Sequence, residues 1–279
     1  MPSLADLVDA YDPGTPLERA STIPAPWYLD ERIFELERRS VFARSWLVAG
    51  RGDQAAGSGA FVAAECGGEP VVAVRGDDGE LRAFFNVCRH HAAAVVTAPE
   101  GTAHLLRCPY HGWTYSLAGE LKGTPAFAGV GDFDRSVNRL VPIPSGTWES
   151  WVFVAVDPVG SLETFLGDDL TARVAPLGLA GMHWVERRRY VLECNWKVFV
   201  DNYLDGGYHV PHLHKGLNSV LDYASYTIEN GARFCLQSSP LVNDGAETET
   251  GAVRIGDRAF YFWIYPNFMI NCYGHAPDT

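Results

Sequence analysis

Short runs of hydrophobic residues, separated by turn residues, dominate the first half of the chain. The runs are rich in valine, alanine and phenylalanine, and Gly67-Gly68 and Asp77-Asp78-Gly79 lie between them. Runs of this length between turn residues predict antiparallel β-strands. The predicted strands cover residues 46–49, 60–64, 71–75, 81–86, 104–107, 113–116, 120–122 and 151–156. We therefore predict an all-β domain over residues 41–160.

The pattern changes at both ends of this domain. Residues 1–40 begin with a proline-rich stretch, which predicts an extended lead-in, and Asp30 is a suitable N-cap for a helix to about Arg44. Another helix is expected after Ser161. Alternating polar and apolar residues at 183–193 predict a long strand.

The remaining part of the chain predicts a helix followed by a sheet. Residues 196–208 have a partial 3.6-residue periodicity, which indicates a helix. Strand-like runs follow at 225–229, 233–238, 259–265 and 268–273. A helix packed on an antiparallel sheet gives an α+β protein, and we assign residues 161–279 to this second domain.

Composition and charge exclude several classes of function. The net charge is −12, which argues against binding to nucleic acid or to an anionic membrane. We expect no membrane span, because no run of eighteen apolar residues occurs, and the N-terminus shows no secretory signal. Four cysteines in mostly apolar surroundings predict buried thiols in a reducing cytoplasm; they are Cys66, Cys194, Cys235 and Cys272.

Two pairs of potential metal ligands lie between Cys88 and His111. The first pair is Cys88-Arg-His90, and after seventeen residues the second is Cys108-Pro-Tyr-His111. Zinc fingers pair cysteine with cysteine and histidine with histidine, whereas each pair here is mixed. Two irons that share bridging sulfides need this arrangement, with both thiolates on one iron and both imidazoles on the other. The spacing therefore favours an iron–sulfur cluster over zinc.

This stretch resembles the Rieske [2Fe–2S] pattern. Besides the four ligand residues, Pro109-Tyr110-His111-Gly112-Trp113 is similar to the second-loop signature of Rieske oxygenases. The resemblance implies that Cys88, His90, Cys108 and His111 hold the cluster. Neutral imidazole ligands make such a cluster easier to reduce than one with four cysteines.

A second group of candidate ligands follows the predicted helix, where three histidines occur within six residues: His209, His212 and His214. Mononuclear non-haem iron that activates O2 takes two histidines and one carboxylate. His209 and His214 lie about 140° apart on an ideal helix, so they share a face only if the helix breaks, as Pro211 predicts. On an unbroken helix, His209 and His212 would be the pair.

Asn-x6-His-x4-His after an Asn-Trp-Lys start resembles the iron-binding segment of Rieske non-haem iron oxygenase α subunits, the aromatic-ring-hydroxylating dioxygenase family. Within that family, the stretch from Asp201 to Pro211 is most similar to choline-monooxygenase-like members. The resemblance implies that His209 and His214 bind iron, that Asn202 lines the iron site and that Asp205 bridges the two metal centres. For His212 we expect a structural role or a place beside the ligands.

The chain departs from the family pattern in two places. Asp205 stands four residues before His209, whereas many members have the bridging acid three before. The family's third iron ligand is a carboxylate from a later helix, and we expect the chain to be truncated before it. The later aspartates lack a matching context, so none is assigned as this ligand; they are Asp222, Asp244, Asp257 and Asp278.

Aromatic residues crowd the last two predicted strands. Alternation along a strand places Phe260 and Phe262 on one face and Tyr261, Trp263 and Tyr265 on the other. One face could line a substrate pocket, stack on an aromatic ring or enclose a quaternary ammonium group through cation–π contacts. Packing in the core is the alternative.

The resemblance implies the oxygenase component of a Rieske-type monooxygenase or dioxygenase. Electrons would come from NAD(P)H through a separate reductase or ferredoxin, pass through the [2Fe–2S] cluster to a mononuclear Fe(II), and activate O2 toward an organic substrate. A head-to-tail homotrimer would place one subunit's cluster near its neighbour's iron. The alternatives are a Rieske electron-transfer protein and an inactive truncated relative without a working iron site.

Overall fold

A computed structural model gives the structure of residues 2–242 and 257–273. The chain divides into two compact units. Among the described residues, one unit comprises residues 43–186, and the other combines the N-terminal stretch ending at Phe42 with the stretch that begins at Arg187 and continues to Tyr273. The domain boundaries given above stay predictions, because this division groups residues by contact and not by function.

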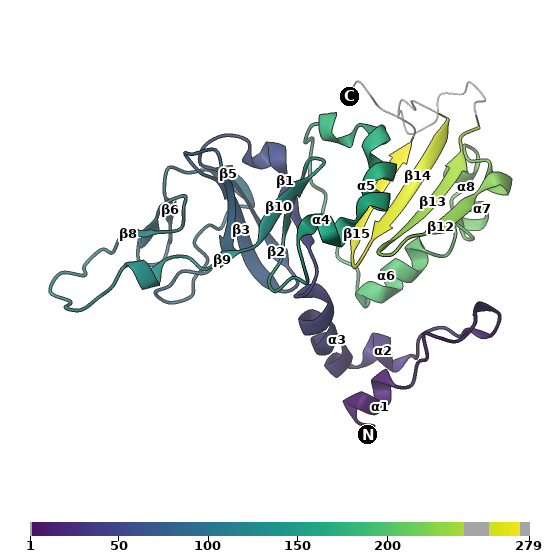
Figure 1. The fold of residues 1–279 in the computed structure, drawn as a ribbon, viewed down its shortest axis with the longest axis horizontal. Helices are drawn as coiled ribbons and strands as arrows, with labels where there is room; N and C mark the ends of the chain where they lie inside the picture. Colours follow the sequence, from purple (N-terminus) through teal and green to yellow (C-terminus); the bar gives the residue numbers. More distant parts are fainter. Residues whose placement is uncertain (1, 243–256, 274–279) are drawn as a thin grey trace. The chain divides into compact units, whose positions relative to one another are not determined.

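The first unit is built from antiparallel β-sheets (Figure 1). Its strands are β1 (Leu47–Arg51), β2 (Ala60–Cys66), β3 (Glu69–Arg75), β4 (Leu81–Phe85), β5 (Glu100–Thr102), β6 (Leu106–Arg107), β7 (Thr114–Tyr115), β8 (Leu121–Gly123), β9 (Pro142–Ile143), β10 (Ser145–Trp148) and β11 (Trp151–Val154). They pair in the orders β1-β11-β10, β5-β2-β3-β4-β9 and β6-β7-β8. The strands predicted in this region are therefore confirmed.

Helices α4 (Leu162–Leu166) and α5 (Asp168–Val174) complete the first unit. The Ser161 side chain accepts a hydrogen bond from the Thr164 amide and caps α4, so the helix expected after Ser161 is confirmed. The strand predicted at 183–193 is wrong, since these residues form no regular structure. The alternation is not that of a half-buried strand, because Val185 and Val191 are both exposed.

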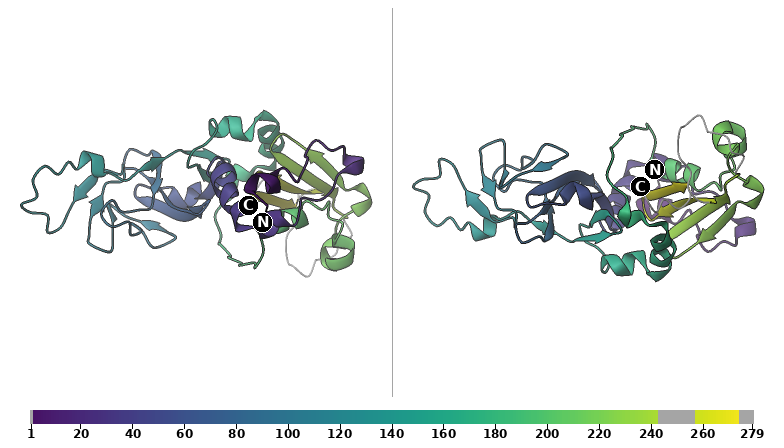
Figure 2. Two further views of the ribbon diagram at one scale, coloured as in Figure 1. Left: turned by 90° about the horizontal axis from the view of Figure 1, so that it is seen from below. Right: turned by 90° about the horizontal axis from the view of Figure 1, so that it is seen from above.

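The second unit packs helices on a four-stranded antiparallel sheet. Its sheet has the order β12 (Thr227–Asn230), β13 (Phe234–Pro240), β14 (Arg258–Ile264) and β15 (Phe268–Tyr273). These strands lie side by side in every view (Figures 1 and 2). Its helices are α1 (Leu4–Val8), α2 (Pro26–Leu29), α3 (Glu31–Glu37), α6 (Trp196–Tyr203), α7 (Val210–Leu213) and α8 (Lys215–Asn218). The predicted α+β class is confirmed.

Two details of the helices differ from the prediction. Asp30 caps α3 through the Arg32 amide, but the helix changes to a π-helical turn at Arg38–Phe42. Helix α6 ends at Tyr203 and not at Tyr208, because Gly206 and Gly207 follow with positive φ angles of 74° and 66°. No helix within the described residues is long and apolar enough to cross a membrane.

Candidate metal centres

Two loops of the β-rich unit have the same backbone design. In the loop after β4, the Ala92 amide donates to the Cys88 carbonyl at 3.0 Å, and the Cys88 amide donates to the Ala93 carbonyl at 2.8 Å. The loop between β6 and β7 has the two matching bonds. The Gly112 amide donates to the Cys108 carbonyl at 3.1 Å, and the Cys108 amide donates to the Trp113 carbonyl at 2.9 Å. The fourth residue after each cysteine, Ala92 or Gly112, has a positive φ. Both cysteines are thus presented in the same way.

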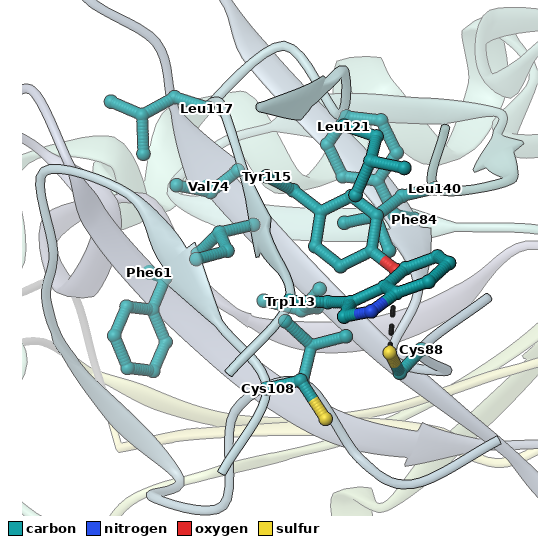
Figure 3. Close-up of a cluster of buried hydrophobic side chains, with 13 residues drawn as sticks. Phe61, Val74, Phe84, Cys88, Cys108, Trp113, Tyr115, Leu117, Leu121 and Leu140 are labelled. Carbon is teal, nitrogen blue, oxygen red and sulfur yellow. Dashed lines mark hydrogen bonds between the residues drawn. The ribbon is translucent and has the colours of Figure 1, made fainter. Parts of the chain in front are cut away.

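The two thiols belong to the core of this unit. Cys88 and Cys108 are 3% and 2% exposed, and they lie in one cluster of buried side chains (Figure 3). The Tyr115 hydroxyl lies 3.3 Å from the Cys88 sulfur and accepts a hydrogen bond from the Arg89 amide at 3.0 Å. All six cysteines are free thiols. Cys194 is exposed, so its predicted burial is wrong; it lies at the end of the irregular segment that was expected to be a strand.

The two predicted histidine ligands meet at the tips of these loops. The rings of His90 and His111 are 4.8 Å apart, and His90 stacks on Trp113 at 4.7 Å with an interplanar angle of 5°. Burial and the neighbouring imidazoles of His91 and His111 lower the pKa of His90. This shift favours the neutral ring, which is the form that binds a metal. Two buried thiols and two imidazoles from separate loops fit the donor set of a Rieske cluster.

His91 is a residue that sequence reasoning missed. Its ring nitrogen lies within 4.8 Å of ligand atoms of both His90 and His111. It stands three residues after Cys88, as His111 stands three after Cys108. His91 is exposed, whereas stacking on Trp113 holds the half-buried His90 in place. The adjacent histidines in the sequence were the available signal.

The second candidate centre lies where the chain turns after α6. The side chain of Asp205 contacts Nδ1 of His209 at 2.5 Å. A carboxylate on Nδ1 fixes the ring and leaves Nε2 as the free ligand atom. The rings of His209 and His214 are 5.0 Å apart at an interplanar angle of 74°. The break falls at the two glycines, and Pro211 lies in the first turn of α7, where its missing N–H is tolerated.

His209 and His214 line one cavity of about 200 Å³. Asn202 also lines this cavity. The exposed His212 is not among the lining residues, and its ring lies 6.0 Å from that of Tyr208. The pair expected from the family therefore lines one cavity, whereas the pair expected from an unbroken helix does not, because His212 is not part of its wall.

The described residues provide no third ligand at this cavity. Among these residues, His90, His91 and His111 bring three histidine, cysteine or carboxylate ligand atoms within reach of one another, and no such group includes His209. Asp222 accepts a hydrogen bond from the Ser225 hydroxyl at 2.7 Å. Asp244 and Asp278 lie outside the described residues. The two imidazoles and the oriented carboxylate beside them fit part of a mononuclear iron site.

Tyrosines form much of the cavity wall, and these are Tyr203, Tyr226, Tyr261 and Tyr273. Burial raises the pKa of the first three, so their phenols stay neutral. Strand register places Tyr261 between Gln237 and Asn271 of the neighbouring strands.

The expected aromatic face divides between two hollows. Tyr261 lines this cavity, whereas Trp263 and Tyr265 line a separate hollow beside β12 and β13. Tyr203 and Tyr226 were missed by sequence reasoning, because they come from α6 and the segment before β12.

Hydrogen bonds hold the wall in one arrangement. The Tyr203 hydroxyl donates to Oδ1 of Asn271 at 2.6 Å, and the Tyr226 hydroxyl donates to Oε1 of Gln237 at 2.9 Å. The side-chain Nε2 of Gln237 in turn donates to the backbone carbonyl of Tyr203 at 2.7 Å. The aromatic rings are therefore fixed by polar groups of the sheet.

Comparisons with protein families match both units. Residues 45–134 match the Rieske [2Fe-2S] domain, and residues 179–276 match the catalytic domain of the ring hydroxylating alpha subunit. The chain is 38% identical to the chloroplastic choline monooxygenase of Arabidopsis thaliana, over 99% of this chain and 67% of the relative. It is 33% identical to the carnitine monooxygenase oxygenase subunit of Escherichia coli K12, over 91% of this chain and 68% of the relative.

Solved structures show the same architecture. A quaternary ammonium Rieske monooxygenase matches with a TM-score of 0.81 at 28% identity, over 90% of this chain and 68% of that chain. Naphthalene 1,2-dioxygenase from Rhodococcus matches with a TM-score of 0.74 at 24% identity, over 90% of this chain and 64% of that chain, which is a likeness of fold. The chain spans about two thirds of the length of these relatives.

Proposed function

The chain belongs to the family of Rieske oxygenase alpha subunits, and from this premise we propose that it is the oxygenase component of a monooxygenase acting on quaternary ammonium compounds. The cavity that His209 and His214 share with four tyrosines carries the proposal. The relatives named above are called choline monooxygenase and carnitine monooxygenase, and both choline and carnitine carry a trimethylammonium group.

We propose the following roles for the site residues. Cys88, Cys108, His90 and His111 would hold the [2Fe–2S] cluster, and His209 and His214 would hold the iron. When bound, the cluster supplies single electrons and the iron supplies oxygen activation.

Two further residues would serve the iron site. Asp205 would orient the His209 ring through Nδ1, as its 2.5 Å contact suggests, and Asn202 would line the site next to the substrate.

The tyrosine wall supports a cationic substrate. A cation over the face of an aromatic ring gains about 0.5–2 kcal/mol, and more than one ring can act on the same trimethylammonium group. The phenols are neutral, so they attract the cation through their rings and hydroxyl oxygens without forming an ion pair. The acidic protein as a whole, with a net charge of −12, also favours a cationic substrate.

We propose a separate reductase and a homotrimer as the working assembly. The family uses small-molecule substrates, O2 and electrons from such a reductase. A heterologous head-to-tail contact closes into a ring without a self-complementary patch, and Asp205 would then lie near the neighbouring subunit's cluster. We infer a reducing compartment, such as the cytoplasm, from the four thiols outside the proposed cluster, Cys66, Cys194, Cys235 and Cys272.

The electron-carrier and inactive-relative alternatives are not favoured. A carrier needs only the cluster loops, yet this chain also has a catalytic-domain match and a cavity lined by two histidines. The relatives are named as monooxygenases.

Oxygen uptake with a substrate panel tests the proposal. The intact protein, supplied with a reductase and NADH, should consume O2 with choline or carnitine. The control is the neutral isostere of choline, in which a tert-butyl group replaces the trimethylammonium. We expect at least about tenfold weaker binding of the isostere, from the lost cation–π term. Equal use of both compounds, or uptake with neutral aromatic compounds alone, would refute the substrate class.

A further inference from the structure

A buried ion pair joins the N-terminal helices to the start of α6. Nζ of Lys197 donates to Oε1 of Glu37 at 2.6 Å, and the two side chains are 9% and 10% exposed. The indole N–H of Trp196 donates to the other Glu37 oxygen at 2.8 Å. Both oxygens of one buried carboxylate therefore bind the Trp-Lys pair of the Asn-Trp-Lys motif. Neither the proposed cluster nor the proposed iron ligands use this pair.

A second set of contacts fixes the same helix. The Tyr28 hydroxyl in α2 donates to the Asp201 carboxylate at 2.5 Å, and burial with this bond raises the pKa of Tyr28 to about 12. The Phe42 ring packs edge-on against Trp196 at 5.1 Å. Helix α6 is thus held both at its first turn and near its last turn by residues 28–42.

Helix α6 transmits this attachment to the candidate iron site. Its last two residues, Asn202 and Tyr203, line the cavity, and the Asp205–His209 contact follows directly. Lys197 and Tyr203 are six residues apart, which is about 9 Å along a helix. A rotation or slide of α6 at its anchored end therefore displaces the cavity wall and the residues beside His209.

We propose that Glu37 is a positioning residue for the mononuclear iron site, which it aligns by clamping Trp196 and Lys197 at the start of α6. The inference rests on the proposed function, since it takes His209 and His214 as the iron ligands. The N-terminal segment then serves the iron site through α6 and is more than a lead-in. A buried pair of charges needs matched partners, because either charge alone would be left without solvent.

The test is the double variant Glu37→Gln/Lys197→Met in the intact protein. It removes both charges and keeps the side-chain volumes, and neutral replacement of a buried pair often preserves stability. We expect the visible cluster spectrum to persist while the dissociation constant for Fe(II) rises by about tenfold or more, as for other groups that orient ligands. The electron paramagnetic resonance signal of the nitric oxide adduct of the iron should also broaden.

The matched control is Glu35→Gln/Arg39→Met, which neutralises an ion pair on the outer side of the same region, with side chains 43% and 77% exposed. It should leave iron affinity unchanged. An Fe(II) affinity within twofold of the wild type in the clamp variant, or an equal loss in the control, would overturn the proposal. If the clamp variant does not fold, Tyr28→Phe decides. It removes only the hydroxyl that bonds Asp201 in α6, and it should weaken iron binding about threefold. Unchanged iron binding in Tyr28→Phe would refute the proposal.

A separate variant distinguishes this inference from the proposed function. If His209→Ala keeps the mononuclear iron, the iron site itself is wrong. If His209→Ala loses iron while the clamp variant keeps full affinity, the ligands stand and only the positioning role of Glu37 is wrong.

Discussion

The cluster loops and the histidine segment are built in different ways. Each cluster loop is closed by two backbone hydrogen bonds, and its cysteine is at most 3% exposed. The histidine segment consists of short helical turns, and its Asp205 and His209 side chains are 31% and 22% exposed. The proposed cluster site lies within 26 residues counted from Cys88 to Trp113. The cavity of the proposed iron site collects residues from α6, α7 and the sheet, so it depends on long-range packing.

The largest effect is expected from the cluster ligands. Cys88→Ser removes a thiolate from one iron and His111→Ala removes an imidazole from the other, and each should abolish the visible Rieske absorbance. His91→Ala is the control, since the exposed neighbouring histidine should leave the spectrum intact. A full spectrum in either ligand variant, or its loss in His91→Ala, would change the ligand assignment.

Substitutions in the histidine segment should remove the mononuclear iron alone. His209→Ala and His214→Ala should each remove the mononuclear iron while the cluster absorbance persists, because the two centres share no ligand. His212→Ala is the matched control, since its side chain does not line the cavity. Metal analysis together with the visible spectrum decides. Iron loss in His212→Ala with retention in His214→Ala would reverse the pairing.

A smaller effect is expected from the carboxylate beside His209. Asp205→Asn keeps the shape and removes the charge, so both metal centres should stay loaded while substrate oxidation falls by about 10–100-fold. Steady-state oxidation, normalised to iron content, measures this. Normal turnover would show that another residue couples the two centres.

The smallest effect is a change in stability, expected at the positive-φ position of each cluster loop. Gly112 has a φ of 73°, and an added Cβ would lie 3.3 Å from Cγ of Pro125, so Gly112→Ala should destabilise the protein by about 1–2 kcal/mol. Ala92 occupies the matching position with a φ of 60°, so Ala92→Gly should change stability by less than about 1 kcal/mol. Thermal unfolding of both variants tests this. Equal destabilisation would show that the loops are not equivalent.

The two cysteines and two histidines that the sequence groups do come together in the structure, because the information that groups them is local. Cysteine and histidine spacing, together with flanking strands, defines two adjacent loops of one sheet system. The sequence also left His209 with either of two partners. The structure places His209 and His214 at the two ends of the short helix α7, where both line one cavity, and Pro211 lies in the first turn of that helix without breaking it.

Long-range features were not predictable from the sequence. Tyr203 and Tyr226 meet in one cavity only through the pairing of the sheet and the packing of α6. The strand expected at 183–193 failed because alternation alone does not provide a partner strand. The contact of Glu37 with Lys197 joins residues 160 positions apart, and no local pattern indicates it.

Iron and acid-labile sulfide counts in the anaerobically purified intact protein test the central claim most directly. We expect two irons and two sulfides from the cluster, plus one further iron. The variant His209→Ala should lose that further iron while its sulfide count stays the same. Two irons and two sulfides with no further iron, in protein reconstituted with Fe(II), would contradict an oxygenase. That result would leave a protein that only carries electrons.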